Sequence, residues 1–289
     1  MGAVRVPIGD VQLYVEIVDQ DPAPAGEERR AVLIGLHGGP GLDGAKLRYQ
    51  LAPLADMARV MVPDQRGHGR SDRGAPETWN LATWAADVKH LSDALRIEHP
   101  VVLGTSFGSF VAQQYAATYP EHAAGLILMS AGARFGSLEE TAARFHQVGG
   151  QVAADAVRRD WETPSAETSA EWERVCEPLL SLRTDPDPLI ADIEAARIRT
   201  IDVNLHFMRE GKAMDLRDCL GAVRCPTLVV VGEHDPLVPI RLATEIVDAI
   251  PDGLARIAVI GGAAHEVLTD NPEATYRVVR KLLADLARA

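Results

Sequence analysis

Short apolar runs recur along the 289-residue chain, and segments with helical periodicity separate most of them. The main runs lie at residues 31–36, 59–62, 100–103, 125–129, 227–231 and 256–260, after two short predicted strands at 3–7 and 11–18. The main runs alternate little with polar residues, which is typical of strands buried on both faces of a parallel sheet. Helices are predicted at residues 44–57, 80–97, 108–119, 239–249 and 272–288. This order favours a doubly wound, mostly parallel α/β sheet.

Two segments lack such strand runs. Residues 21–30 form a polar, proline-containing stretch and are predicted to be a loop. Residues 134–217 show helical periodicity without a buried-strand run. We therefore expect residues 1–133 and 218–289 to form one catalytic domain that contains the sheet. Residues 134–217 would form a helical cap inserted into it.

The composition excludes several classes of protein. Forty-one acidic residues outnumber 29 Lys and Arg residues, giving a formal net charge of −12, and no basic block could follow a phosphate backbone. The three cysteines lack CxxC spacing and are interpreted as small buried side chains of a protein in a reducing cytosol. No apolar run reaches the ~18 residues of a membrane span, and the N-terminus resembles no secretory signal. The sequence therefore predicts a cytoplasmic protein without nucleic-acid or membrane partners, and it leaves the oligomeric state open.

The segment Gly104-Thr105-Ser106-Phe107-Gly108 carries the strongest chemical signal. It has the form G-x-S-x-G between a predicted strand and a predicted helix, the context in which a serine is exposed as a nucleophile on a tight turn. The N-terminal N–H groups of the following helix point toward negative charge that forms there. The alternative is an ordinary loop in which Ser106 caps the helix.

A serine nucleophile needs a base that is oriented by an acid. Asp235 follows the predicted strand at 227–231, and we predict that it is the acid, with Glu233 as second choice because it lies closer to the strand end. His265 lies in a glycine-containing loop after the last strand and is the only histidine beyond position 234. The order Ser106, Asp235, His265 therefore predicts a catalytic triad without a metal or organic cofactor.

The loop His37-Gly38-Gly39-Pro40-Gly41 follows the strand at 31–36. Acyl transfer requires N–H donors for the oxyanion, and we assign these to Phe107 and Gly39, with Gly38 as the alternative to Gly39. His37 is interpreted as a structural residue of this loop.

The same region offers a different interpretation. Gly39, Gly41 and Gly44 match G-x-G-x-x-G after a strand, and Asp64 lies twenty residues beyond Gly44, as in dinucleotide-binding sites. Pro40 removes an N–H and Asp43 adds a carboxylate where a pyrophosphate needs donors. This interpretation also leaves the predicted triad unexplained.

With these motifs the chain resembles the α/β-hydrolases, and within them the proline iminopeptidases. The resemblance rests on HGGPG (37–41), DQRGHGRSD (64–72), GTSFGS (104–109), GEHDPLVP (232–239) and the loop histidine. It implies an α/β-hydrolase fold with a helical cap and a serine hydrolase that releases N-terminal Pro or small residues from peptides or amides. In the segment 64–72, Asp64, Arg66 and Ser71 are interpreted as a polar network that fixes the loop, and His68 as similar in role.

The resemblance also implies cap residues that hold the substrate's free amine. Trp172 and Glu173 match the second of two tryptophans and its glutamate, whereas Ser169 stands at the first tryptophan position. Asp202 lies one residue away from the position of a second glutamate. Residues 150–187 contain nine Asp and Glu against four Arg, which suits a cationic amine but equally a solvated helical face.

The sequence is compatible with two other functions. One is an esterase, lactonase or amidase that acts on a small non-peptide acyl substrate. The other is a catalytically silent α/β-hydrolase fold that serves as a ligand receptor, because a fold alone does not fix a function.

Overall fold

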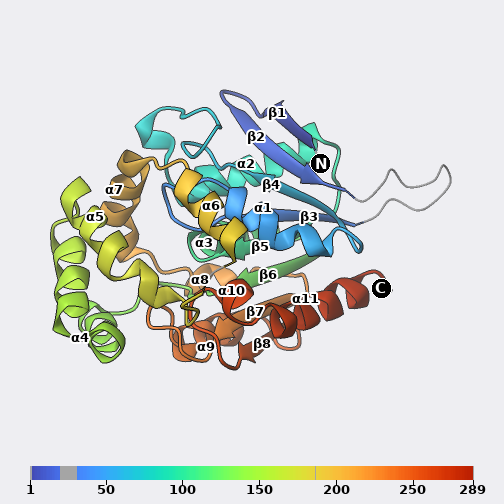
Figure 1. Cartoon of the computed structure of the whole chain (residues 1–289). Helices are drawn as coiled ribbons and strands as arrows, with labels where there is room; N and C mark the ends of the chain where they lie inside the picture. Colours follow the sequence, from blue (N-terminus) through green and yellow to red (C-terminus); the bar gives the residue numbers. More distant parts are fainter. Residues whose placement is uncertain (1, 20–30, 186, 289) are drawn as a thin grey trace.

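The computed structural model describes residues 2–19, 31–185 and 187–288, so the predicted loop at 21–30 lies outside the described residues. Its centre is an eight-stranded sheet of order β1-β2-β4-β3-β5-β6-β7-β8 (Figure 1). The strands are β1 Gly2–Pro7, β2 Gln12–Val18, β3 Val32–Leu36, β4 Arg59–Pro63, β5 Val101–Thr105, β6 Gly125–Met129, β7 Thr227–Gly232 and β8 Ala255–Ile260. β1 and β2 pair antiparallel with their neighbours, and all other pairs are parallel. The predicted doubly wound, mostly parallel sheet is confirmed.

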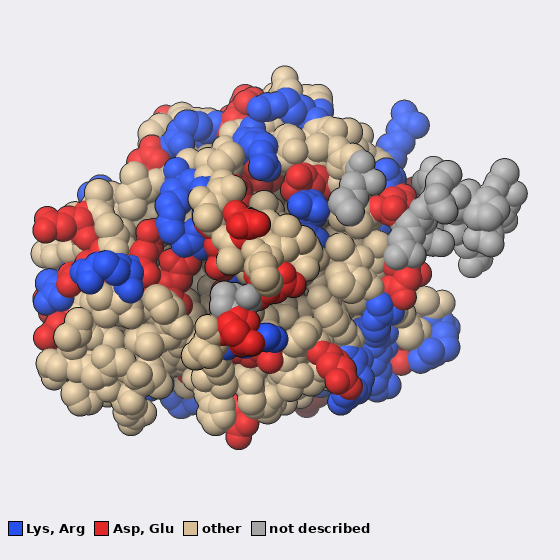
Figure 2. Space-filling view, viewed as in Figure 1, with Lys and Arg blue, Asp and Glu red and all other residues tan. Residues whose placement is uncertain are grey.

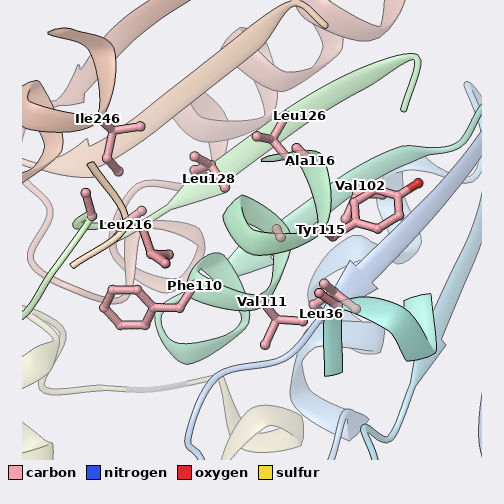
Figure 3. Close-up of a cluster of buried hydrophobic side chains, with 14 of the residues drawn as sticks. Leu36, Val102, Phe110, Val111, Tyr115, Ala116, Leu126, Leu128, Leu216 and Ile246 are labelled. Atoms are coloured by element: carbon pink, nitrogen blue, oxygen red, sulfur yellow. The ribbon is translucent and has the colours of Figure 1, made fainter. Parts of the chain in front are cut away.

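Helices cover both faces of the sheet. They are α1 Ala45–Leu51, α2 Leu81–Ala94, α3 Phe107–Thr118, α8 Arg217–Leu220, α9 Ile240–Ala249, α10 Val267–Asp270 and α11 Pro272–Leu286. One core lies between the sheet and α2, α3, α8 and α9, and Figure 3 shows part of it around Tyr115 and Phe110. A second core lies between the opposite face and α1 and α11. Because side chains alternate along a strand, Leu126 and Leu128 enter the first core whereas Ile127 and Met129 enter the second.

Two predicted elements differ in detail from those observed. The helix predicted at 44–57 ends as α1 at Leu51 and continues only as a 3₁₀ turn at 52–54, since Pro53 has no N–H for a further α-helical bond. β8 is apolar in sequence but lies at the sheet edge, and its Val259 is 45% exposed.

Between β6 and β7, the described residues of the segment 134–217 form helices and no strand of the sheet. They include α4 Leu138–Glu162, α5 Ala166–Val175, α6 Pro188–Ala196 and α7 Ile201–Glu210. α4, α5 and α7 lie at one side of the molecule, and α6 returns across α1 (Figure 1). The two ends of the segment meet, because Arg134 and Asp215 form an isolated antiparallel bridge. Leu216 and Leu220 at its end pack into the first core of the sheet.

Candidate active site

Ser106 lies at the junction of β5 and α3, in the tight turn that the sequence predicts. Its backbone angles, φ 51° and ψ −118°, fall in a region that residues other than glycine rarely adopt. Glycine is required on both sides of it. A Cβ at Gly104 would come within 2.2 Å of the Gly108 carbonyl oxygen, and a Cβ at Gly108 within 2.2 Å of the Leu36 carbonyl oxygen. The turn therefore depends on close contact between the backbones of β5, α3 and β3.

His265 and Asp235 lie in the loops after β8 and β7 and are both buried. The Nδ1 atom of His265 is 2.8 Å from Oδ2 of Asp235. The other oxygen of Asp235 accepts N–H hydrogen bonds of 2.8 Å each from Leu237 and Val238, so the carboxylate is held from both sides. Glu233 is 51% exposed and contacts the N–H of Gly262. The structure thus brings Asp235, and not Glu233, to His265.

The surroundings of His265 raise its pKa above the ordinary value. Burial, the largest influence, lowers this pKa, but the negative charge and hydrogen bond of Asp235 more than offset it. Ser130, directly after β6, donates a 2.5 Å hydrogen bond to the main-chain oxygen of His265. No sequence pattern indicates this contact, because the two residues meet only through the order of the strands.

The glycine-rich loop after β3 lies against the nucleophile. A Cβ at Gly38 would be 3.4 Å from that of Ser106, and Gly39 has a φ of 120° and precedes Pro40 through a cis peptide bond. His37 is buried and fixes the loop. Its Nε2 accepts the N–H of Gln65 at 3.1 Å, which leaves Nδ1 protonated to donate to the Gly38 oxygen at 2.8 Å. Burial is the largest influence on His37 and lowers its pKa, in keeping with a neutral, structural side chain.

The segment 64–72 supports this loop from behind. The Arg66 guanidinium donates to both oxygens of Asp87 at 2.8 Å, and Ser71 donates to the Asp64 main-chain oxygen at 2.5 Å. His68 is buried and stacks on Phe107 with ring centroids 5.6 Å apart. Burial, above all, lowers its pKa to about 3, so it is neutral. These contacts are those of the predicted loop-fixing network.

The hydrogen bonds of this loop argue against the dinucleotide-binding interpretation. The buried carboxylate of Asp64 accepts the N–H groups of Gly44 and Arg70 at 2.7 and 2.8 Å. Asp43 accepts the N–H groups of Ala45 and Ile198. Carboxylates of the protein therefore already occupy the donors that a pyrophosphate would need.

A cleft with two lobes opens at Ser106. Seven residues border both lobes: Gly39, Pro40, Ser106, Asp160, Trp172, Asn204 and Leu237. One lobe is charged and is bordered by His265 together with Asp43, Lys46, Glu173, Glu177, Arg197, Arg199 and Glu266. The other is mainly apolar and is bordered by Phe107, Phe110, Phe135, Trp161, Phe207 and Leu242. Both include residues from the sheet-containing part of the chain and from the segment 134–217.

The predicted amine-binding residues are only partly brought together. Trp172 borders both lobes, and Glu173 borders the charged lobe but forms an ion pair with Arg199. Burial raises the pKa of Glu173. Asp202 is 58% exposed, forms an ion pair with Arg73 and borders neither lobe, so the structure does not bring it to Ser106.

Asp160 is a residue of the cleft that no sequence motif indicates. It lies near the C-terminal end of α4, where the sequence shows an ordinary amphipathic helix. Ser169, at the position where the resemblance leads one to expect a tryptophan, is hydrogen-bonded to it at 3.3 Å.

Acidic and basic side chains are interspersed over the face shown in Figure 2. Many acidic residues of the segment 134–217 have arginine partners, such as Glu171 with Arg159 and Glu177 with Arg197. The acidic excess of residues 150–187 is therefore largely a paired helical surface. Within the described residues, no three His, Cys, Asp or Glu side chains are grouped as metal ligands. No described helix is long and apolar enough to span a membrane.

Residues 31–272 match the family model described as the alpha/beta hydrolase fold. The chain belongs to this family. The predictions of the α/β-hydrolase fold and of a hydrolase are therefore confirmed.

Relatives of the chain include several kinds of hydrolase. A proline iminopeptidase from Pestalotiopsis fici is 26% identical over 284 residues, covering 96% of this chain and 98% of the relative. A putative carbamate hydrolase from Escherichia coli is 27% identical over 267 residues, covering 92% and 95%. The crystal structure of a proline iminopeptidase from Mycobacterium smegmatis superposes with a TM-score of 0.76 at 24% identity, covering 99% and 98% of the two chains. A malate-bound esterase from Thermogutta terrifontis reaches 0.74 at 24% identity and covers 99% of each chain. This α/β-hydrolase thus resembles peptidases and esterases about equally in fold.

Proposed function

We propose that this α/β-hydrolase is a serine hydrolase that cleaves a carboxylic ester or amide through an acyl-enzyme on Ser106. The observation that carries the proposal is the 2.8 Å contact between His265 Nδ1 and Asp235 Oδ2, in a cleft bordered by both Ser106 and His265. A histidine held in this way accepts a proton on Nε2 and becomes an imidazolium that Asp235 stabilises.

The reaction would proceed in two steps. Ser106 Oγ attacks the carbonyl carbon while His265 takes the hydroxyl proton, and the N–H groups of Phe107 and Gly39 stabilise the oxyanion. His265 then gives the proton to the leaving group, which departs and leaves an ester on Ser106. Water, deprotonated by His265, hydrolyses that ester. The chain's own residues supply each proton transfer in this scheme.

We assign residues 1–133 and 218–289 to the catalytic domain and 134–217 to a cap that closes the cleft over Ser106. Asp160, Trp172 and Asn204, which border both lobes, support this division. A closed cleft would exclude water and strengthen the electrostatic contacts in it. The protein would act in the cytoplasm on a small molecule or short peptide.

The first substrate candidate is a peptide or amide with a free N-terminal Pro or small residue. It rests on the sequence resemblance and on the proline iminopeptidase relative. Trp172 and Glu173, which border the cleft, are the candidate binding residues in this case.

The second candidate is a small non-peptide ester, lactone or amide. Its support is that Glu173 is already paired with Arg199, while Asp202 lies at the surface beside Arg73. The two candidates are separated by comparing the turnover of prolyl anilide, alanyl anilide and short acyl esters.

A fluorophosphonate probe tests the proposed chemistry without knowledge of the substrate. We expect stoichiometric labelling of native protein on Ser106, located by peptide mass spectrometry. Heat-unfolded protein is the control and should not be labelled, because the hydroxyl is reactive only beside its base. Absence of labelling in the native state would contradict the proposal and favour a silent ligand receptor.

A further inference from the structure

The difference between the two lobes indicates how a substrate is oriented in the cleft. His265 must protonate the leaving group, and it borders the charged lobe but not the apolar lobe. The leaving group therefore belongs in the charged lobe. The acyl part, which stays on Ser106, belongs in the apolar lobe between Phe110, Phe135 and Trp161.

Asp160 is a buried carboxylate at the junction of these lobes. It is 8% exposed and borders both lobes, as Ser106 does. Thr168 donates a 3.0 Å hydrogen bond to its Oδ1, and Ser169 lies 3.3 Å from the same oxygen. No hydrogen bond of the described residues reaches Oδ2, and Asp160 forms no ion pair with any of them.

A carboxylate in such a place has capacity for a ligand. Each oxygen can accept two hydrogen bonds, and burial without a cation is costly for the charged form. Burial accordingly raises the pKa of Asp160, although its two hydroxyl partners and the charge of Lys212 lower it. Lys212 itself is bound to the main-chain oxygen of Trp161. A cation from the substrate would compensate the buried charge.

We propose that Asp160 binds the α-ammonium group of an aminoacyl substrate whose apolar side chain fills the apolar lobe. The proposal rests on the serine-hydrolase function above. An α-amine is bonded to the carbon next to the reacting carbonyl, so its partner must be within reach of a substrate on Ser106. Asp160 meets this condition in that it borders the same two lobes as Ser106. The substrate class is thus an ester or amide of an apolar amino acid with a free amine.

Glu173 is the competing amine site. It borders only the charged lobe, where the leaving group would lie, and its carboxylate already pairs with Arg199. Glu173 and Arg199 would then contact the leaving group rather than the amine.

The test compares two substrates that differ only in the amine: L-phenylalanine methyl ester and methyl 3-phenylpropionate. Asp160→Asn keeps an acceptor for Thr168 and Ser169 but removes the charge. We expect kcat/KM for the amine-bearing ester to fall about 10- to 100-fold, the usual effect of losing a charged hydrogen bond. Turnover of methyl 3-phenylpropionate should stay within about twofold of wild type.

Matched variants separate the alternatives. Ser169→Ala removes a partner of Asp160 but keeps its charge, and Glu173→Gln neutralises the competing site. Both should leave the ratio of the two kcat/KM values unchanged. Equal losses on both esters in Asp160→Asn, or a selective loss in Glu173→Gln instead, would overturn the proposal.

Two further results are decisive. If Asp160→Asn does not fold, Asp160→Glu and the wild-type preference decide: wild-type protein that does not prefer the amine-bearing ester overturns the proposal. If wild-type protein hydrolyses methyl 3-phenylpropionate and reacts with fluorophosphonate, the hydrolase function stands whatever the amine ratio. Turnover of neither ester, with no labelling, would overturn both.

Discussion

Ser130 donates a 2.5 Å hydrogen bond from its hydroxyl to the main-chain oxygen of His265, 135 residues later in the chain. Ser130 follows β6 directly, is buried and has a φ of 49°. Its own N–H donates to the Val230 oxygen at 2.8 Å, so its position is fixed by the sheet. The contact ties the loop that carries the proposed base to the strand ends beneath it.

Ser130→Ala should therefore affect both stability and turnover. Removal of the hydroxyl leaves the His265 oxygen without this partner, which costs about 1–2 kcal/mol in free energy of unfolding. We expect a several-fold lower kcat with little change in KM. The reason is that the substitution loosens the position of His265 but leaves the shape of the cleft unchanged. Urea denaturation and steady-state kinetics measure the two effects.

Ser92→Ala is the control for the loss of a buried serine hydroxyl. Ser92 lies in α2, and its hydroxyl donates to the Val88 oxygen at 2.9 Å. This variant should keep wild-type kcat. An unchanged kcat in Ser130→Ala would show that the contact does not position His265.

The pH dependence of kcat/KM reports the charge on His265. A general base must be neutral, so activity should fall as pH drops through its pKa, which lies above the ordinary value in this fold. In Asp235→Asn the carboxylate that raises this pKa is gone and burial dominates. We therefore expect the acidic limb to shift to lower pH and kcat to fall by several orders of magnitude.

Glu233→Gln provides the comparison for that variant. Glu233 is exposed and lies away from His265, so its neutralisation should leave both the acidic limb and kcat near the wild-type values. A shift of the limb in Glu233→Gln, with none in Asp235→Asn, would reassign the acid.

Ser106→Ala should abolish nearly all turnover, by several orders of magnitude, while the protein stays folded. The close backbone contacts of the turn are made at Gly104 and Gly108, so the replacement of Ser106 leaves them in place. Circular dichroism and thermal unfolding would check the fold, and kinetics on any substrate of the parent would check turnover. Wild-type rates in this variant would refute a mechanism through Ser106.

Gly108→Ala tests the packing of the nucleophile turn. Its Cβ would lie 2.2 Å from the Leu36 oxygen and 2.7 Å from the His37 oxygen, and both are main-chain atoms that cannot rotate away. We expect a loss of several kcal/mol in free energy of unfolding, or failure to fold, from overpacking. Chemical denaturation or soluble yield gives the measurement.

Gly221→Ala is the matched glycine replacement. Gly221 has helical φ and ψ angles, and a Cβ there would meet nothing within 4 Å. Its stability should stay within about 1 kcal/mol of wild type or increase. Equal stability of the two variants would show that β5, α3 and β3 separate more easily than their contacts indicate.

Local patterns in the sequence located most of the fold. The apolar runs around residues 101–105 and 125–129 predict β5 and β6, because strands buried on both faces must be apolar throughout. The edge position of β8 was not predictable in this way, since its run is as apolar as that of a central strand. Pairing between distant strands determines which run lies at an edge.

The candidate site also contains some residues that the sequence predicts and others that it does not. Ser106, Asp235 and His265 each follow a strand, and the carboxyl ends of parallel strands meet at one edge of the sheet, so motif order predicts their proximity. Residues of the segment 134–217 have no such relation to the strand ends. Asp202 and Asp160 lie on amphipathic helices that look alike in sequence, yet one pairs with Arg73 at the surface and the other borders the cleft.

The sequence by itself thus determined the sheet, the tight turn at Ser106 and the order of the proposed triad, because these depend on local periodicity and glycine spacing. Only the tertiary structure decided that Asp235 rather than Glu233 reaches His265, and that Ser130 holds the histidine loop. It also decided that Asp202 is paired at the surface whereas Asp160 borders the cleft. Those outcomes depend on how strands and helices far apart in the chain pack together, which no local pattern records.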